Sequence, residues 1–173
     1  MGNERVACGV MKRSTLTHLT DQGAVHMVKI GDKSKTARFA IARAEVETTK
    51  AVIDAVRRSN VGKGDVLAVV RIAAIGACKR TSELIPLCHP VAVTGVDVRV
   101  ELSRTRAVIQ VRVDADDRTG AEMEAMVAAA VGALTFYDMC KSLDHWMCVT
   151  KVVLLEKSGG KSGHLKRPKA PKR

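Results

Sequence analysis

Two neighbouring segments alternate between apolar and polar residues. Val and Leu occupy every second position of residues 96–102, and Ile, Val and Ala do so in residues 109–115, with charged or amide residues between them. A period of two is typical of a strand with one buried face. The residues that join them, Ser103–Arg106, are few and mostly polar, so the two strands are predicted to form a hairpin.

A long apolar segment follows this hairpin. Residues 125–137 contain no Pro, one Gly and several strong helix formers, which predicts a helix. It is apolar on every side, so we expect it to be buried all round, and at 13 residues the run is too short to span a bilayer. Glu122 and Glu124 precede it. Since residues two apart share a side only in an extended chain, we predict an extended lead-in through Glu124.

The remaining elements are predicted from weaker patterns. Residues 37–47 and 149–156 read as strands. Thr48 or Thr49 is a suitable cap for one helix, and Asp65 for a second that runs to about residue 80. The segment between Pro86 and Pro90 cannot be helical.

The predicted order is strand, two helices, two strands, helix, strand. Apart from the doubled helix, this is the pattern of an α+β, ferredoxin-like antiparallel sheet with helices packed on one face. We expect a flexible arm at residues 1–14, one catalytic domain at 15–156, and a Gly/Lys-rich basic loop and tail at 157–173. Because helices would cover only one face of the sheet, we expect some apolar surface to stay exposed within the subunit. A partner subunit could bury it.

Charge is distributed unevenly along the 173 residues. The net charge is +11, of which +7 lies in residues 157–173, so the rest of the chain carries only +4. A basic tail indicates an anionic partner. Nucleic acid is disfavoured as that partner, because aromatic residues, which stack on bases, make up only 2% of the chain.

The five cysteines form no CxxC motif, and there is no apolar signal-peptide core near Met1. An odd number of unpatterned cysteines is typical of free thiols in a reducing compartment, so we expect a cytoplasmic protein without a membrane anchor.

The segment Leu87-Cys88-His89 places a thiol beside an imidazole in a loop stiffened by proline. A Cys/His catalytic dyad is disfavoured because adjacent side chains diverge, and zinc is disfavoured because no second ligand pair has the right spacing. Two alternatives stay open: His89 donates a hydrogen bond to an anion, or it is a structural loop histidine.

Lysines and carboxylates supply the other candidates. Lys63 lies between two glycines before a capped helix, where it either binds an anion or is a solvated loop residue. Asp138 and Lys141 are three apart on one helix face. They form either a surface ion pair or a partly buried pair in which the pKa of the lysine is tuned for proton transfer.

Two further groups have similar alternatives. Glu122 and Glu124 are either carboxylates at a helix N-terminus, stabilised by the helix dipole, or a pair that binds the amidine-like edge of a purine or pterin. Residues 157–163 carry Lys157 and Lys161 on glycine hinges, as a mobile phosphate clamp or as a flexible basic tail. They are not a P-loop, because Leu155 stands where that motif needs glycine.

The two ends of the long helix pose a geometric problem. Glu124 and Asp138 would be roughly 20 Å apart on an unbroken helix. They can share one pocket only if a second subunit supplies one of them.

Four segments in this order carry a resemblance: KGDVLAVVRIAAIGACKRTSELIPLCHP, RTGAEMEA, ALTFYDMCK and LLEKSGGKSG. Together they resemble the cyclic pyranopterin monophosphate synthase family of molybdenum cofactor biosynthesis (molybdenum cofactor biosynthesis protein C), over about residues 15–164. The resemblance implies a lyase that converts 3′,8-cyclo-7,8-dihydro-GTP to cyclic pyranopterin monophosphate and pyrophosphate. It also implies a homohexamer, a trimer of dimers, with active sites between subunits. No cofactor or bound metal is expected, and whether Mg²⁺ accompanies the triphosphate stays open.

The resemblance also implies roles for residues that match its motifs. Lys63 and Lys141 are similar to the family's general acid/base pair, and Asp138 to its active-site aspartate. The residues implied in substrate binding are Leu87, Cys88, His89, Glu122, Met123, Glu124, Arg38, Lys157 and Lys161.

Overall fold

The computed structural model describes residues 24–168, so the predicted arm at 1–14 lies outside the described part. Five strands and four helices follow in chain order. They are β1 (Thr36–Glu47), α1 (Lys50–Arg57), α2 (Val66–Cys78), α3 (Thr81–Leu84), β2 (Val93–Leu102), β3 (Arg106–Asp117), α4 (Glu122–Cys140), β4 (Cys148–Ser158) and β5 (Leu165–Lys166).

All strand pairs in the sheet are antiparallel, and their order is β2-β3-β1-β4-β5. The first four strands have the order of a ferredoxin-like fold, so the predicted α+β class is confirmed. The predicted hairpin is β2 and β3. Strand β5 adds an edge that the sequence pattern did not predict: Leu165 and Lys166 pair with the end of β4. The predicted division into arm, domain and tail stays a prediction.

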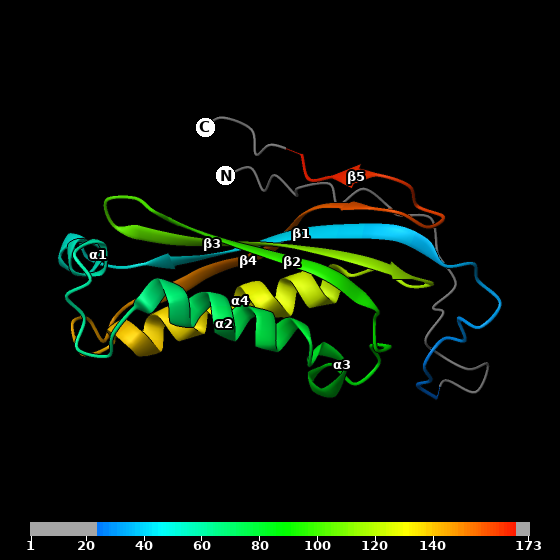
Figure 1. Cartoon of the computed structure of the whole chain (residues 1–173), viewed down its shortest axis with the longest axis horizontal. Helices are drawn as coiled ribbons and strands as arrows, with labels where there is room; N and C mark the ends of the chain where they lie inside the picture. Colours follow the sequence, from blue (N-terminus) through cyan, green and yellow to red (C-terminus); the bar gives the residue numbers. More distant parts are fainter. Residues whose placement is uncertain (1–23, 169–173) are drawn as a thin grey trace, which may run out of the picture.

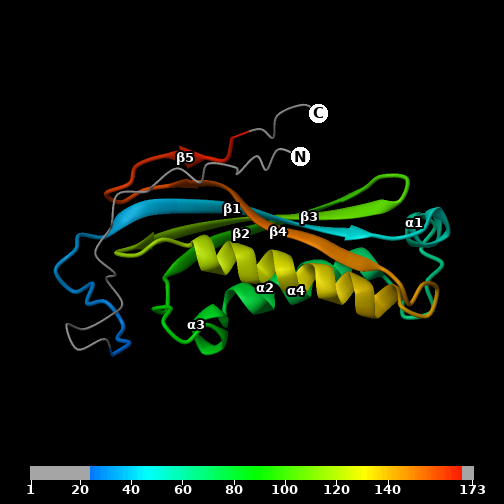
Figure 2. The same ribbon diagram turned by 180° about the vertical axis from the view of Figure 1, so that it is seen from behind.

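Helices α2 and α4 lie side by side, antiparallel, on one face of the sheet (Figures 1 and 2). The buried face of the sheet consists of small and branched residues, such as Ala42 and Ala44 of β1 and Val111 and Val113 of β3. Helix α4 meets this face with Ala125, Ala128, Ala129 and Ala133, all buried. Small side chains on both sides bring the helix close to the sheet, and this fixes where both ends of α4 lie.

The caps of α1 and α2 form as predicted. The side chain of Thr49 accepts a hydrogen bond from the amide of Val52, and Asp65 accepts one from the amide of Ala68 at 3.0 Å. Each satisfies an otherwise unpaired donor of the first turn. The cap at Asp65 also fixes the loop that precedes it, which carries Lys63.

The prediction of an extended lead-in through Glu124 is wrong, because α4 begins at Glu122. Two carboxylates in the first turn are favoured by the positive end of the helix dipole, and this local effect decides the boundary. Since the two residues are on a helix, their side chains point apart: Glu124 turns into the core and is 3% exposed, whereas Glu122 faces Lys157.

The expectation that the long helix is buried on all sides is also wrong. The sheet covers one side of α4 and α2 another, but Leu134 is 59% exposed. On α2, Ile72 is 71% exposed and Val69 is also exposed. With 19 residues, α4 is long and apolar enough to cross a bilayer by length and composition. Its packing against the sheet is that of a core helix in a globular domain.

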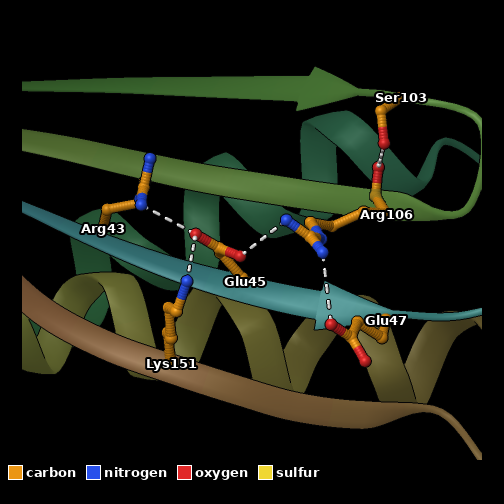
Figure 3. Close-up of polar contacts among 6 residues, drawn as sticks. All are labelled: Arg43, Glu45, Glu47, Ser103, Arg106 and Lys151. Atoms are coloured by element: carbon orange, nitrogen blue, oxygen red, sulfur yellow. Dashed lines mark hydrogen bonds and ion pairs between the residues drawn. The ribbon is translucent and has the colours of Figure 1, made fainter. Parts of the chain in front are cut away.

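The other face of the sheet carries a charged cluster around Glu45 (Figure 3). This carboxylate of β1 is 2% exposed. It lies 2.8 Å from Arg43, 3.1 Å from Arg106 and 3.7 Å from Lys151. Three cations therefore compensate its burial. The cluster contains none of the predicted site residues.

Candidate active site

Lys63, Asp138 and Lys141 form one cluster at the end of the molecule that carries α1. The ammonium of Lys63 donates to Oδ2 of Asp138 and to its backbone carbonyl, both at 2.7 Å. The ammonium of Lys141 lies 2.8 Å from Oδ1 of the same carboxylate. One carboxylate thus holds two ammonium groups. The contact across 75 residues exists because α2 and α4 are antiparallel, which puts the loop before α2 beside the end of α4 (Figure 1).

The electrostatics of this cluster favour its charged form. Hydrogen bonds from Lys141 and Lys63 lower the pKa of Asp138 to about 2. The hydrogen bond with Asp138, and then its charge, raise the pKa of Lys141. The Asp138 side chain is 56% exposed, so the partly buried pair considered from sequence is absent from the protomer. Within this chain, the cluster is a solvated array of two cations around an anion, open to a ligand.

Leu87, Cys88 and His89 lie at the opposite end of α4, where they line a cavity of about 270 Å³. The same cavity is lined by the end of the preceding turn and the start of α4: Thr119, Gly120, Glu122, Met123 and Glu124. The structure thus joins the two predicted substrate-contact segments. The loop after α3 supplies one wall and the first turn of α4 the other. The cavity combines apolar side chains, an imidazole and two carboxyl groups.

Two titratable groups in this cavity are shifted towards their neutral forms. Burial, and then the charges of Glu122 and Asp117, raise the pKa of Glu124 to about 7. Burial, and then the charge of Glu124, raise the pKa of Cys88. A raised thiol pKa disfavours a nucleophilic Cys88. Glu124, in contrast, can donate or accept a proton near neutral pH, a property suited to the edge of a heterocyclic base.

A basic cavity of about 900 Å³ includes Arg38 and Lys161 among its lining residues. Lys29, Lys33 and Arg118 also line it and are not among the predicted site residues. The several lysines within residues 29–38 could have indicated this part of the cavity. The sequence of a polar loop, however, does not show in which direction its side chains point. With these five cations, Asp32 is the one carboxylate in the described lining, so the cavity suits a polyanion.

Lys157 connects the two cavities. Its ammonium lies 2.6 Å from Oε1 of Glu122, and both side chains are largely buried. Lys157 is on β4, just before the glycine loop that carries Lys161, whereas Glu122 lines the smaller cavity. The predicted residues therefore lie in two groups at opposite ends of α4. Lys63, Asp138 and Lys141 form one group, and the other consists of Arg38, Leu87, Cys88, His89, Glu122, Met123, Glu124, Lys157 and Lys161.

No group of three or more His, Cys, Asp or Glu side chains suited to a metal ion occurs within residues 24–168. The four cysteines in this range, Cys78, Cys88, Cys140 and Cys148, are free thiols, as predicted for them. That the reaction needs no cofactor stays a prediction.

Comparison with known proteins identifies close relatives of this chain. The model that describes the MoaC family matches residues 27–160. The chain is 49% identical over 158 residues to the cyclic pyranopterin monophosphate synthase of Bacillus thuringiensis subsp. konkukian (strain 97-27), a match that covers 89% of this chain and 98% of the relative. Over the same shares it is 48% identical to the proteins of that name from Bacillus cereus (strain B4264) and Bacillus anthracis (strain CDC 684 / NRRL 3495).

Proposed function

The chain belongs to the MoaC family, and from this premise we propose that it is a lyase of molybdenum cofactor biosynthesis that converts 3′,8-cyclo-7,8-dihydro-GTP to cyclic pyranopterin monophosphate and pyrophosphate. The family membership predicted from the sequence motifs is confirmed. The observation that carries the proposed reaction is the cluster of Lys63, Asp138 and Lys141, in which two ammonium groups share one carboxylate.

The cluster suits the proton transfers of the reaction. Opening a reduced purine ring and closing a pterin ring require protons to leave and to reach ring and ribose atoms, and positioned side chains can carry them. Lys63 and Lys141 are the proposed acid/base pair. Asp138 holds both ammonium groups on the same side of the α4 terminus and stabilises their charged forms.

The release of pyrophosphate fits the basic residues. To close the cyclic phosphate, a ribose hydroxyl oxygen bonds to the α-phosphorus and loses its proton, while the bond from that phosphorus to the pyrophosphate oxygen breaks. The departing negative charge needs preorganised cations around it. Lys161, Lys33 and Arg118 of the basic cavity supply such cations, and Leu87–His89 with Met123 and Glu124 surround the heterocycle.

We propose that each active site combines two subunits. The two groups of site residues lie at opposite ends of α4, roughly 20 Å apart within one protomer. Between the ends, the outer faces of α2 and α4 expose Ile72, Val69 and Leu134, an apolar surface suited to a second copy. Two copies packed antiparallel along α4 bring unlike ends together. This arrangement, repeated as a trimer of dimers, is the proposed homohexamer. A cytoplasmic location is part of the proposal, supported by the free thiols.

The test is an incubation of the purified protein with freshly prepared 3′,8-cyclo-7,8-dihydro-GTP, with and without Mg²⁺. Pyrophosphate and the oxidised, fluorescent pterin are followed together. Appearance of both in equal amounts is the expected result. If neither appears while the protein is folded and oligomeric, the chain has the family's fold without its chemistry.

A further inference from the structure

Arg38 lies where three segments of the chain meet. It is half-buried near the start of β1. Its Nε donates to the backbone carbonyl of Asp117 at 2.8 Å, and its Nη2 donates to that of Arg118 at 3.2 Å. These carbonyls belong to the last residue of β3 and to the first residue of the turn that leads into α4. Two of the five N–H donors of this guanidinium are therefore used by the protein itself.

Gly160 packs against this guanidinium, and the preceding Gly159 packs against the Cγ of the same side chain and the backbone of Ala37. Both glycines have positive φ, at +104° and +69°. A Cβ atom on Gly160 would lie 2.5 Å from Nη1 of Arg38, and one on Gly159 would lie 2.9 Å from the carbonyl oxygen of Ala37. While Arg38 keeps this position, neither glycine has room for a Cβ, so the loop that carries Lys161 is packed against Arg38.

The same loop is attached a second time, through Lys157. This residue pairs with Ala40 of β1 in the sheet, and its ammonium reaches Glu122 at the start of α4. Arg38 and Lys157 together connect the loop to the turn and to the first helical residue. These connections link the loop that carries Lys161 to the turn that carries Arg118, and both residues line the basic cavity.

We propose that Arg38 is a positioning residue, which fastens the Lys157–Lys161 loop to the turn at residues 117–118 and so shapes the basic cavity. For turnover this inference rests on the proposed function. If Arg38 bound phosphate directly, substrate binding would depend mainly on the charge of residue 38. If Arg38 positions the loop, substrate binding depends on the planar guanidinium, which donates to two carbonyls at once. Lysine keeps the charge and lacks the fork.

The kinetic test uses Arg38→Lys, Arg38→Ala, Gly160→Ala and the double variant Arg38→Ala/Gly160→Ala. Gly163→Ala is the matched control, because Gly163 also has positive φ, at +60°, but has open space where the Cβ would be. We expect Arg38→Lys, Arg38→Ala and Gly160→Ala to raise KM by similar factors, about ten- to hundredfold, with smaller changes in kcat. Gly163→Ala changes KM by less than about threefold.

The double variant further distinguishes a positioning role of Arg38 from direct phosphate binding. If both single substitutions disrupt the same contact between the loop and Arg38, their effects on KM overlap. The KM of the double variant is then no higher than that of the more impaired single variant. A wild-type KM in Arg38→Lys, or losses that multiply in the double variant, would overturn the inference in favour of direct phosphate binding.

A second readout does not need turnover. Hydrogen exchange is measured at residues 115–122 in the resting protein without substrate. We expect faster exchange there in Arg38→Lys and Gly160→Ala, and unchanged exchange in Gly163→Ala. Unchanged exchange in all variants overturns the inference. If the wild-type protein shows no turnover, the proposed function fails, while exchange still decides the role of Arg38.

Discussion

Glu124 and Asp138 stand at opposite ends of the same unbroken helix, α4, roughly 20 Å apart. Glu124 is buried beside Leu87–His89, and Asp138 is exposed between two lysines. If both groups act on the same substrate, as proposed, the length of a rigid helix requires a second subunit to supply one of them. The pairing of unlike ends from two subunits is therefore a testable consequence of the length of α4.

Mixed oligomers test this consequence. Lys63→Ala and His89→Ala alter opposite ends, so each variant alone has no intact shared site. A mixed dimer contains one site with both substitutions and one intact site. Random mixing of the two variants should restore up to about a quarter of wild-type activity. The variants are co-expressed in equal amounts, and the oligomers are purified without selection for the mixed species and assayed.

The control is a mixture of Lys63→Ala with Lys141→Ala, which alter the same end. Every site in that mixture lacks one lysine, so activity should stay absent. Equal recovery in both mixtures, or none in either, contradicts shared sites of this kind.

Removal of either lysine of the cluster should stop turnover without unfolding the protein. Lys63 and Lys141 are exposed, so Lys63→Ala and Lys141→Ala leave the core intact. Loss of a general acid or base is expected to lower kcat by about 10²- to 10⁴-fold. Steady-state kinetics and thermal unfolding are measured on the same preparations. Lys50→Ala, which removes an exposed lysine from α1, is the control and should keep its activity. Full activity in both cluster variants would show that the assigned roles are wrong.

Asp138→Asn tests the electrostatic part of the cluster. Asp138 raises the pKa of Lys141, first through the hydrogen bond and then through its charge. Replacing the carboxylate with an amide removes the charge, so the pKa of Lys141 should fall. An NMR titration of the lysine side-chain signals, assigned by comparison with Lys141→Ala, measures the shift directly. An unchanged or higher Lys141 pKa in Asp138→Asn contradicts the geometry of the pair.

Glu124→Gln should change how stability depends on pH. Burial raises the pKa of Glu124 from 4.5 to about 7, so the folded protein holds this proton more tightly than the unfolded chain. Its contribution is fully present below pH 4.5 and is lost as pH rises through about 7. The difference amounts to on the order of 3 kcal/mol of unfolding free energy.

Glutamine stays neutral, so the variant should lose this part of the pH dependence and be the more stable protein at pH 8. Urea unfolding at pH 4.5 and pH 8, at one protein concentration, measures the effect. Glu101→Gln, at an exposed position on β2, is the control and should keep the wild-type slope. The same change in stability between these pH values in the wild type and in Glu124→Gln would contradict the raised pKa of Glu124.

The basic C-terminus allows a test of the nucleic-acid alternative. Leu165 and Lys166 form β5 and the amide of Arg167 bonds to Leu155, so a truncation from residue 165 would remove part of the sheet. Deletion of residues 169–173 leaves these contacts and removes three cations. Turnover should stay within about twofold, because the named site residues remain. Any binding to a 20-base-pair duplex should weaken, with a salt slope smaller by roughly 2 to 3. Unchanged duplex affinity would place nucleic-acid binding elsewhere on the protein.

Much of the fold could be predicted from local pattern. The alternation in residues 96–102 and 109–115 identified β2 and β3, and Thr49 and Asp65 marked the starts of α1 and α2. These features are readable because a strand's period and a capping hydrogen bond depend on residues close in sequence. The start of α4 could not be predicted in this way, because two carboxylates two residues apart are compatible both with an extended segment and with the first turn of a helix.

The sequence by itself determined the ferredoxin-like order of elements and the family, since motif residues and burial patterns are local properties. Tertiary structure alone decided that Lys63 reaches Asp138, that Leu87–His89 share a cavity with Glu122–Glu124, and that Arg38 bonds to backbone carbonyls. Each of these contacts joins segments distant in sequence. Their proximity follows from strand register and from the antiparallel packing of α2 and α4, which no single segment encodes.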